Sequence, residues 1–155
     1  MRVLAALVMA TSLGCGACGG GGQLSHHAHA REASDLCRRQ TRHAHATDLP
    51  NLDRPHDAAR AIERAVERQR GVLAELRDLD PPKVEQSAIV RWLALIDQLL
   101  DEADLMVQQL RRGDHDAASE TAARVGALDA RGSELARHHD ITPCHFPDVG
   151  GPRSG

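Results

Sequence analysis

The chain has 155 residues, which is about the size of one domain. It contains a single Trp, a single Phe and no Tyr, so that aromatic residues make up only 1%. This excludes nucleic-acid readers that stack bases on aromatic side chains, and it disfavours a β-sandwich. A formal charge of −3 provides no overall basic field, so no nucleic-acid partner is expected. The abundance of Ala, Leu, Arg and Glu favours helices.

The N-terminus has the pattern of an export signal. Met1 and Arg2 give a positive start, and residues 3–13 form an apolar run. Spanning a bilayer takes about twenty apolar residues, so this run is too short for a membrane helix but suits a secretory signal. We therefore expect residues 1–14 to be a signal peptide.

The residues that follow resemble the lipobox of bacterial lipoproteins. Small residues, Thr11-Ser12-Leu13-Gly14, lead into Cys15. The resemblance implies cleavage after Gly14 and a lipid on Cys15, which would anchor the chain in a membrane. Cys18 is a second candidate for the lipid, and Ser12, where the family usually has Leu, leaves cleavage without lipid as an alternative. The protein is then expected in the bacterial cell envelope, in the periplasm or at the cell surface.

Residues 15–30 are rich first in Gly and then in His, and such a stretch has little apolar surface to bury. We expect a flexible tether here. A helical domain is expected over residues 31–146, followed by a disordered tail over residues 147–155.

Apolar spacing predicts four helices in this domain, joined by short connections. Their expected ranges are residues 32–46, 55–79, 83–112 and 115–139. The expected apolar faces include Ile62, Val66, Leu73 and Leu76 on the second helix, Trp92, Leu99, Ala103, Met106 and Leu110 on the third, and Thr121, Val125, Leu128 and Leu135 on the fourth. Asp80-Pro81-Pro82 and Gly113-Asp114 are expected to end helices. Short connections imply an all-α, antiparallel up-and-down bundle of three or four helices.

Two cysteines fall in the expected domain. In this topology Cys37, early in the first helix, and Cys144, just after the fourth, lie at the same end of the bundle. The sequence therefore predicts a Cys37–Cys144 disulfide, which persists after export. Two free thiols or a metal-binding pair are the alternatives.

The domain also resembles a group of small, uncharacterised exported or lipid-anchored helical proteins of GC-rich bacteria. The resemblance covers residues 32–146. It is carried by Asp35-Leu36-Cys37, the stop at residues 76–82, the long helix with Trp92, the Arg112-Gly113-Asp114 turn and Ile141-Thr142-Pro143-Cys144. It implies a helical bundle with a disulfide near its ends and no assigned activity.

Ten histidines are the unusual feature of the composition. The expected topology sorts them into two groups. One end receives His43, His45, His56 and His115, and the other end receives His26, His27, His29, His138, His139 and His145. Imidazole binds Zn, Cu and Ni, so either group could supply two or three ligands, and the first group is the candidate metal site, although solvated surface histidines are the simpler interpretation.

No catalytic motif accompanies these histidines. Asp97, Asp101, Glu102 and Asp104 are interpreted as a solvated helix face, and the arginines of residues 60–70 as local ion pairs with Glu63 and Glu67. We therefore expect a non-enzymatic binding or scaffolding protein without a cofactor. Its partners would be the membrane, through the lipid, and an unknown envelope protein or small ligand. The alternative is a His-dependent divalent-metal binder.

Overall fold

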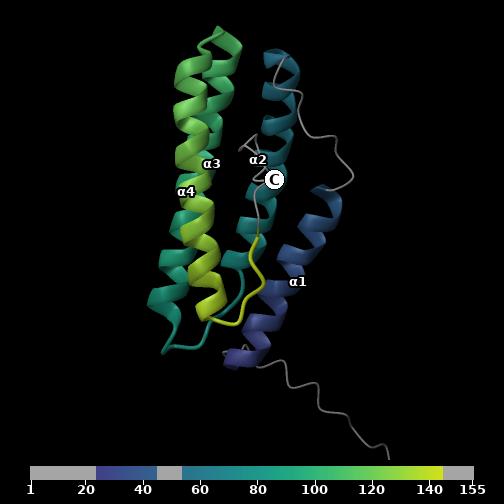
Figure 1. The fold of residues 1–155 in the computed structure, drawn as a ribbon. Helices are drawn as coiled ribbons and strands as arrows, with labels where there is room; N and C mark the ends of the chain where they lie inside the picture. The colour runs from purple at the N-terminus through teal and green to yellow at the C-terminus, as the bar shows by residue number, and fades with distance from the viewer. Residues whose placement is uncertain (1–23, 45–53, 145–155) are drawn as a thin grey trace, which may run out of the picture.

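The computed structural model describes residues 24–44 and 54–144, with side chains for residues 24–40 and 54–144. The regular elements in these residues are α1 (His26–Ala44), α2 (Pro55–Arg77), α3 (Gln86–Arg112) and α4 (His115–His138). Successive helices run in opposite directions (Figure 1), with α3 packed against α2 and α4, and α1 packed against α2. The expected all-α, antiparallel up-and-down bundle is confirmed.

Several sequence expectations lie outside the described residues. These are the signal peptide at residues 1–14, the lipid on Cys15, the tether up to residue 23, and the tail at residues 147–155. Within the ranges 24–44 and 54–144, no helix combines the length and apolar character needed to cross a membrane.

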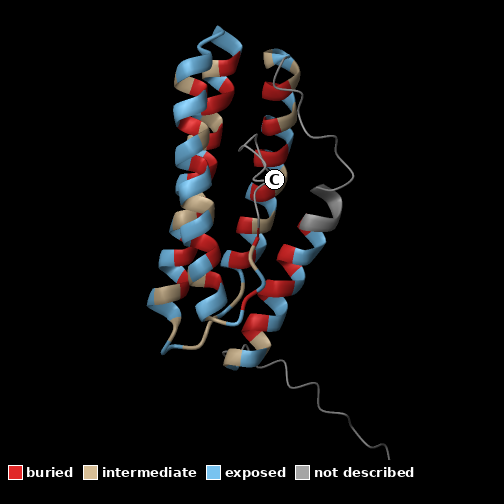
Figure 2. Cartoon of the chain, viewed as in Figure 1, coloured by how far each residue is buried: buried red, intermediate tan, exposed pale blue. Residues whose placement is uncertain are grey.

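The bundle interior is filled with aliphatic side chains around one Trp. Figure 2 shows the buried residues along the facing sides of the helices. The expected face of α2 is buried, and so are Trp92, Leu99, Ala103, Met106 and Leu110 of α3. A small space between α2, α3, α4 and Cys144 measures about 10 Å³, which is close to the minimum for one water molecule. The core therefore contains no sizeable void there.

The two turns at residues 78–85 and 113–114 follow their local chemistry. The backbone N–H of Asp78 caps α2 by bonding to the carbonyl of Ala74, before the two prolines prevent its continuation. Gly113 ends α3 in the left-handed region, with φ 73°, where a residue without Cβ is favoured. Asp114 then caps α4, its side chain accepting a hydrogen bond from the Ala117 N–H at 3.2 Å.

Replacing Asp114 by Ala is expected to lower the free energy of unfolding by about 1 kcal/mol, because it removes the only side-chain cap recorded for α4 among the described residues. Urea unfolding followed by circular dichroism measures the change. The matched control is Glu120→Ala, an exposed position on the same helix, which should change stability by less than about 0.5 kcal/mol. An equal loss in both variants would contradict the capping role.

The first helix begins earlier than the sequence suggested. It starts at His26 rather than near residue 32, so that residues 26–30, expected to belong to the tether, are helical. Ser25 explains the start, because its hydroxyl accepts a hydrogen bond from the Ala28 N–H at 3.3 Å. His29 and Ala30 are both buried, which a solvated tether would not allow. The expectation of a flexible tether through residue 30 was therefore wrong over its last five residues.

The segment after α4 closes the bundle against α1. It runs back along the bundle from the end of α4 (Figure 1) and brings Cys144 to a disulfide with Cys37, with Cα atoms 4.5 Å apart. The Thr142 N–H also donates to the Ser34 hydroxyl at 2.8 Å, and Arg38 donates to the Thr142 hydroxyl at 3.1 Å. The predicted disulfide is confirmed, and neither free thiols nor a metal pair fits this geometry.

Candidate functional site

Titratable side chains from three parts of the chain meet at one end of the bundle. They come from the first turns of α1, from the residue that precedes α3, and from the segment that follows α4. These ends lie together because the helices alternate in direction (Figure 1). The members of this histidine–carboxylate cluster are His26, His29, Glu85, His139 and Asp140.

His26 is held between two carboxylates. Its Nδ1 lies 2.6 Å from Oε1 of Glu85, and its Nε2 lies 3.1 Å from Oδ2 of Asp140, to which it donates a hydrogen bond. These hydrogen-bonding carboxylates, Asp140 first and Glu85 second, raise the pKa of His26 above its usual value of 6.5. Glu85 also faces a second imidazole, since its Oε2 lies 3.7 Å from Nδ1 of His139.

His29 lies one turn further along α1 in a different environment. It is only 2% exposed, and its Nε2 is buried with no hydrogen-bond partner among the described residues. Burial lowers the pKa of His29, and it outweighs the attraction of Glu85 and Glu32. The pKa of His26 is therefore raised and the pKa of His29 is lowered, although the two residues are only one helical turn apart.

This arrangement can gain and lose protons near neutral pH while it holds three parts of the chain together. Both nitrogens of His26 face carboxylates, on opposite edges of the ring. In the part of the chain that the structure describes, no three His, Cys, Asp or Glu side chains are arranged to hold a metal ion. The ion pairs of the cluster are electrostatic contacts between these chain segments.

The predicted metal group at the opposite end is only partly within the described residues. His56, in the first turn of α2, and His115, the first residue of α4, are both exposed at that end. His45 and the side chain of His43 lie outside the described residues. A site formed by these four histidines stays a prediction.

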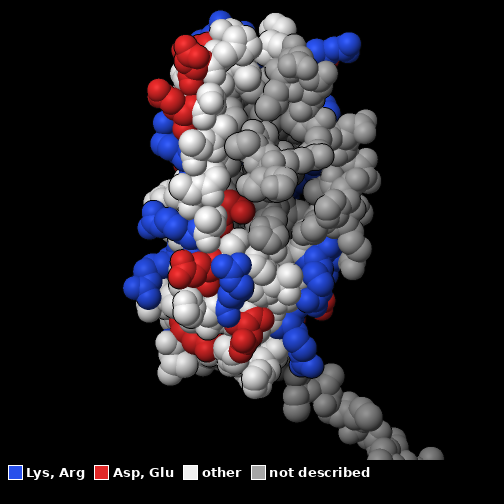
Figure 3. All heavy atoms as spheres, in the orientation of Figure 1, with Lys and Arg blue, Asp and Glu red and all other residues white. Residues whose placement is uncertain are grey.

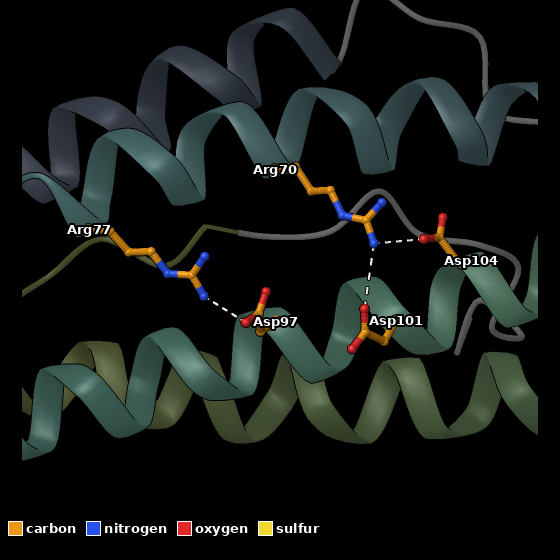
Figure 4. Close-up of polar contacts among 5 residues, drawn as sticks. All are labelled: Arg70, Arg77, Asp97, Asp101 and Asp104. Atoms are coloured by element: carbon orange, nitrogen blue, oxygen red, sulfur yellow. Dashed lines mark hydrogen bonds and ion pairs between the residues drawn. The ribbon is translucent and has the colours of Figure 1, made fainter.

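Ion pairs join the helices along the surface. Arg70 of α2 lies 2.7 Å from Asp104 and 3.5 Å from Asp101, and Arg77 lies 2.6 Å from Asp97 (Figure 4). These acidic residues were interpreted as a solvated face, but each of them pairs with an arginine of the neighbouring helix.

Two further ion pairs also join neighbouring helices. Glu63, expected to pair locally, binds Arg111 of α3 at 2.7 Å, and Glu102 binds Arg124 of α4 at 2.9 Å. On the face seen in Figure 3, cationic and anionic side chains are interspersed. Exposed pairs contribute about 0–1 kcal/mol each, so they add little to the stability of the bundle.

One open groove lies between α3 and α4. It has a volume of about 520 Å³ and is lined by Gln98, Asp101, Glu102, Arg124, Ala127, Leu128 and Arg131. Arg124 in this groove is already paired with Glu102 and also donates to the Thr121 hydroxyl at 2.8 Å. The groove is thus a shallow surface of mixed charge over a small apolar floor.

Comparison of the chain with protein-family models, with curated proteins and with solved structures finds no match.

Sequence analysis placed His26, His29 and His139 at one end but missed the two carboxylates that contact His26 and His139. Glu85 lies in the connection before α3, and Asp140 lies just beyond α4. A usable signal was present, since both acidic residues flank expected helix ends on the same side of the bundle. Asp140 also adopts a positive φ of 55°, an unusual backbone conformation for a residue other than glycine.

Proposed function

We propose that this chain is an exported bacterial envelope protein, tethered to a membrane by a lipid on Cys15. In this proposal the helical bundle is a non-enzymatic binding or scaffolding module for an envelope protein or small ligand. The observation that carries the proposal is the Cys37–Cys144 disulfide, because such bonds persist in exported proteins and are rare in the cytosol.

The way α1 is held supports a role for the disulfide in an oxidising compartment. Among residues 26–40 of α1, the buried apolar residues are Ala30, Ala33, Leu36 and Cys37. The remaining contacts to the C-terminal segment are polar, through Ser34 and Arg38. Over its described side chains, α1 therefore buries fewer large apolar residues than α2 or α3, and the disulfide adds a covalent attachment.

The position of α1 also suits a tether on the N-terminal side. Cys15 precedes His26 by eleven positions, a length of chain that reaches at most about 40 Å when extended. A lipid on Cys15 would then keep the histidine–carboxylate end of the bundle near the membrane. The opposite end and the α3–α4 groove would remain available to partners.

The tether is tested by replacing Cys15 with Ser in the full chain, expressed in a bacterium with an export system. We expect the unchanged chain to sediment with membranes and to have a mass above that of a chain beginning at Cys15, by the mass of its acyl groups. Several acyl chains hold a protein firmly, since each buried methylene contributes about 0.8 kcal/mol. Cys15→Ser should move the protein to the soluble fraction.

The control is Cys18→Ser, which removes the neighbouring cysteine and should leave the protein in the membrane fraction. The proposal would be wrong if Cys15→Ser stayed membrane-bound after losing residues 1–14, or if the unchanged chain were recovered without added mass. Retention of the Cys37–Cys144 bond in the soluble variant would show that export is independent of the lipid.

A further inference from the structure

His26 and His29 lie one helical turn apart at the start of α1, and they require opposite charge states for their surroundings. His26 faces the carboxylates of Glu85 and Asp140 at 2.6 Å and 3.1 Å. His29 is buried, with its Nε2 unpartnered among the described residues. Residues three apart share one side of a helix, so both rings act on the same contact between α1 and the rest of the bundle.

We propose that His26 and His29 form a two-sided pH latch, which docks the first turns of α1 when His26 is protonated and His29 is neutral, and which loosens when either condition fails.

The alkaline side of the latch follows from the two contacts of His26. A neutral imidazole has one N–H, so it can donate to Asp140 or to Glu85 but not to both. With its proton on Nε2, the lone pair of Nδ1 faces the Oε1 atom of Glu85 at 2.6 Å, which is repulsive. Because the folded pKa of His26 is raised, its contribution is present below the ordinary value of 6.5 and is lost as pH rises through the folded pKa.

The acidic side follows from the burial of His29. Protonation would place a charge on a ring that is 2% exposed, next to the imidazoles of His26 and His139. Because the folded pKa of His29 is lowered, its contribution is present above 6.5 and is lost as pH falls through the folded pKa. The two contributions together make docking strongest near pH 6.5.

The other titratable groups around these rings are compatible with the latch. Glu32 on α1 and Glu85 before α3 raise the pKa of His29, whereas His139 after α4 lowers it. Burial also lowers this pKa and has the largest effect. Asp140 acts on His26. From α2, the carboxylate of Glu75 meets α1 at Arg39, more than three turns beyond His26.

The disulfide limits how far the latch can open. Cys37 lies eleven residues after His26 and is joined to Cys144, so opening is confined to the turns that precede it. The core formed by α2, α3 and α4 is unaffected. Opening therefore loosens only the first turns of α1, and the rest of the protein stays folded.

The test is amide hydrogen exchange of the full chain, with its disulfide intact, between pH 5 and pH 8.5. Protection factors of the amides of residues 29–33, corrected for intrinsic exchange, are expected to peak near pH 6.5 and to fall several-fold on either side. Amides in the middle of α3 serve as the internal reference. His26→Gln should remove the alkaline fall, and His29→Gln should remove the acidic fall.

His115→Gln is the matched control, because His115 is exposed at the opposite end, and it should leave both sides of the profile unchanged. Should His29→Gln fail to dock α1 at any pH, NMR titration of the imidazoles in the unchanged protein still decides the matter. The proposal requires midpoints above 6.5 for His26 and below 6.5 for His29. A flat or one-sided protection profile, or two midpoints at 6.5, would overturn it.

Discussion

Replacing both Cys37 and Cys144 by Ala is expected to lower the free energy of unfolding by about 4–5 kcal/mol, from the entropy of the 107-residue loop that the disulfide closes in the unfolded chain. For a domain of this size the loss corresponds to a decrease in melting temperature of roughly 10–20 °C. Most small domains have a total stability of about 5–15 kcal/mol, so the loss would remove between about a third and nearly all of it. Thermal and urea unfolding followed by circular dichroism measure both quantities.

The control compares the double variant with the unchanged protein in the presence of a reductant. Both lack the bond, but only the variant loses the two sulfur atoms from a buried site, where Cys37 is fully enclosed. We expect the two to differ by less than about 1.5 kcal/mol, since the loss of a single atom from each side chain is a small change in volume. A stability loss under about 1 kcal/mol in the variant would show that α1 and the C-terminal segment hold together without the bond.

Replacing Trp92 by Ala is expected to cost about 3–5 kcal/mol, the usual range for removing a large aromatic side chain from a packed core. Trp92 is 2% exposed and borders the small interior space shared by Gln69 of α2, Ser133 of α4 and Cys144. No close backbone contact joins α2 to α4 among the described residues, so this side chain fills the distance between them. Urea unfolding followed by circular dichroism gives the change, since the variant has no Trp fluorescence.

Val90→Ala is the matched control on the same helix, because Val90 is 58% exposed. It should change stability by less than about 0.5 kcal/mol. If Trp92→Ala cost no more than Val90→Ala, the side chain would not lie in the core and the packing of α3 between its neighbours would be wrong.

The long apolar face of α3 shows why the fold could be predicted from sequence. Its residues from Trp92 to Leu110 recur at helical spacing, and the structure buries them as expected. Proline and glycine at the turns then limit the helix ends to within a few residues. With the directions of the helices fixed, the segment after α4 starts at the end of the bundle where α1 begins, and it runs back to bring Cys144 to Cys37.

The start of α1 could not be predicted in the same way. The composition around His26 and His29 is that of an unordered segment, and Ser25 alone is a weak indication of a helix start. The charge environment of His29 includes Glu85 and His139, which are far away in the sequence and reach this end only through the assembled bundle. Helical periodicity shows which face of a helix is polar, but it does not show which residues of another element that face will meet.

The surface ion pairs illustrate the same limit. Asp97 and Asp104 are on a polar face of α3, as the sequence indicates, but their arginine partners on α2 depend on how the two helices are aligned. Charge pattern within one helix predicts pairs three or four residues apart. To predict pairs between helices, one must also know how the two helices are rotated and shifted along their axes relative to each other.

The measurement that tests this account most directly is disulfide mapping of the exported, membrane-associated protein without reduction. Cleavage after Arg and Lys separates Cys37 into the peptide of residues 32–38 and Cys144 into the peptide of residues 138–153. The account predicts one cross-linked species with the combined mass of these two peptides, and its disappearance after reduction. Recovery of the two peptides unlinked, with free thiols, from protein purified under oxidising conditions would contradict it.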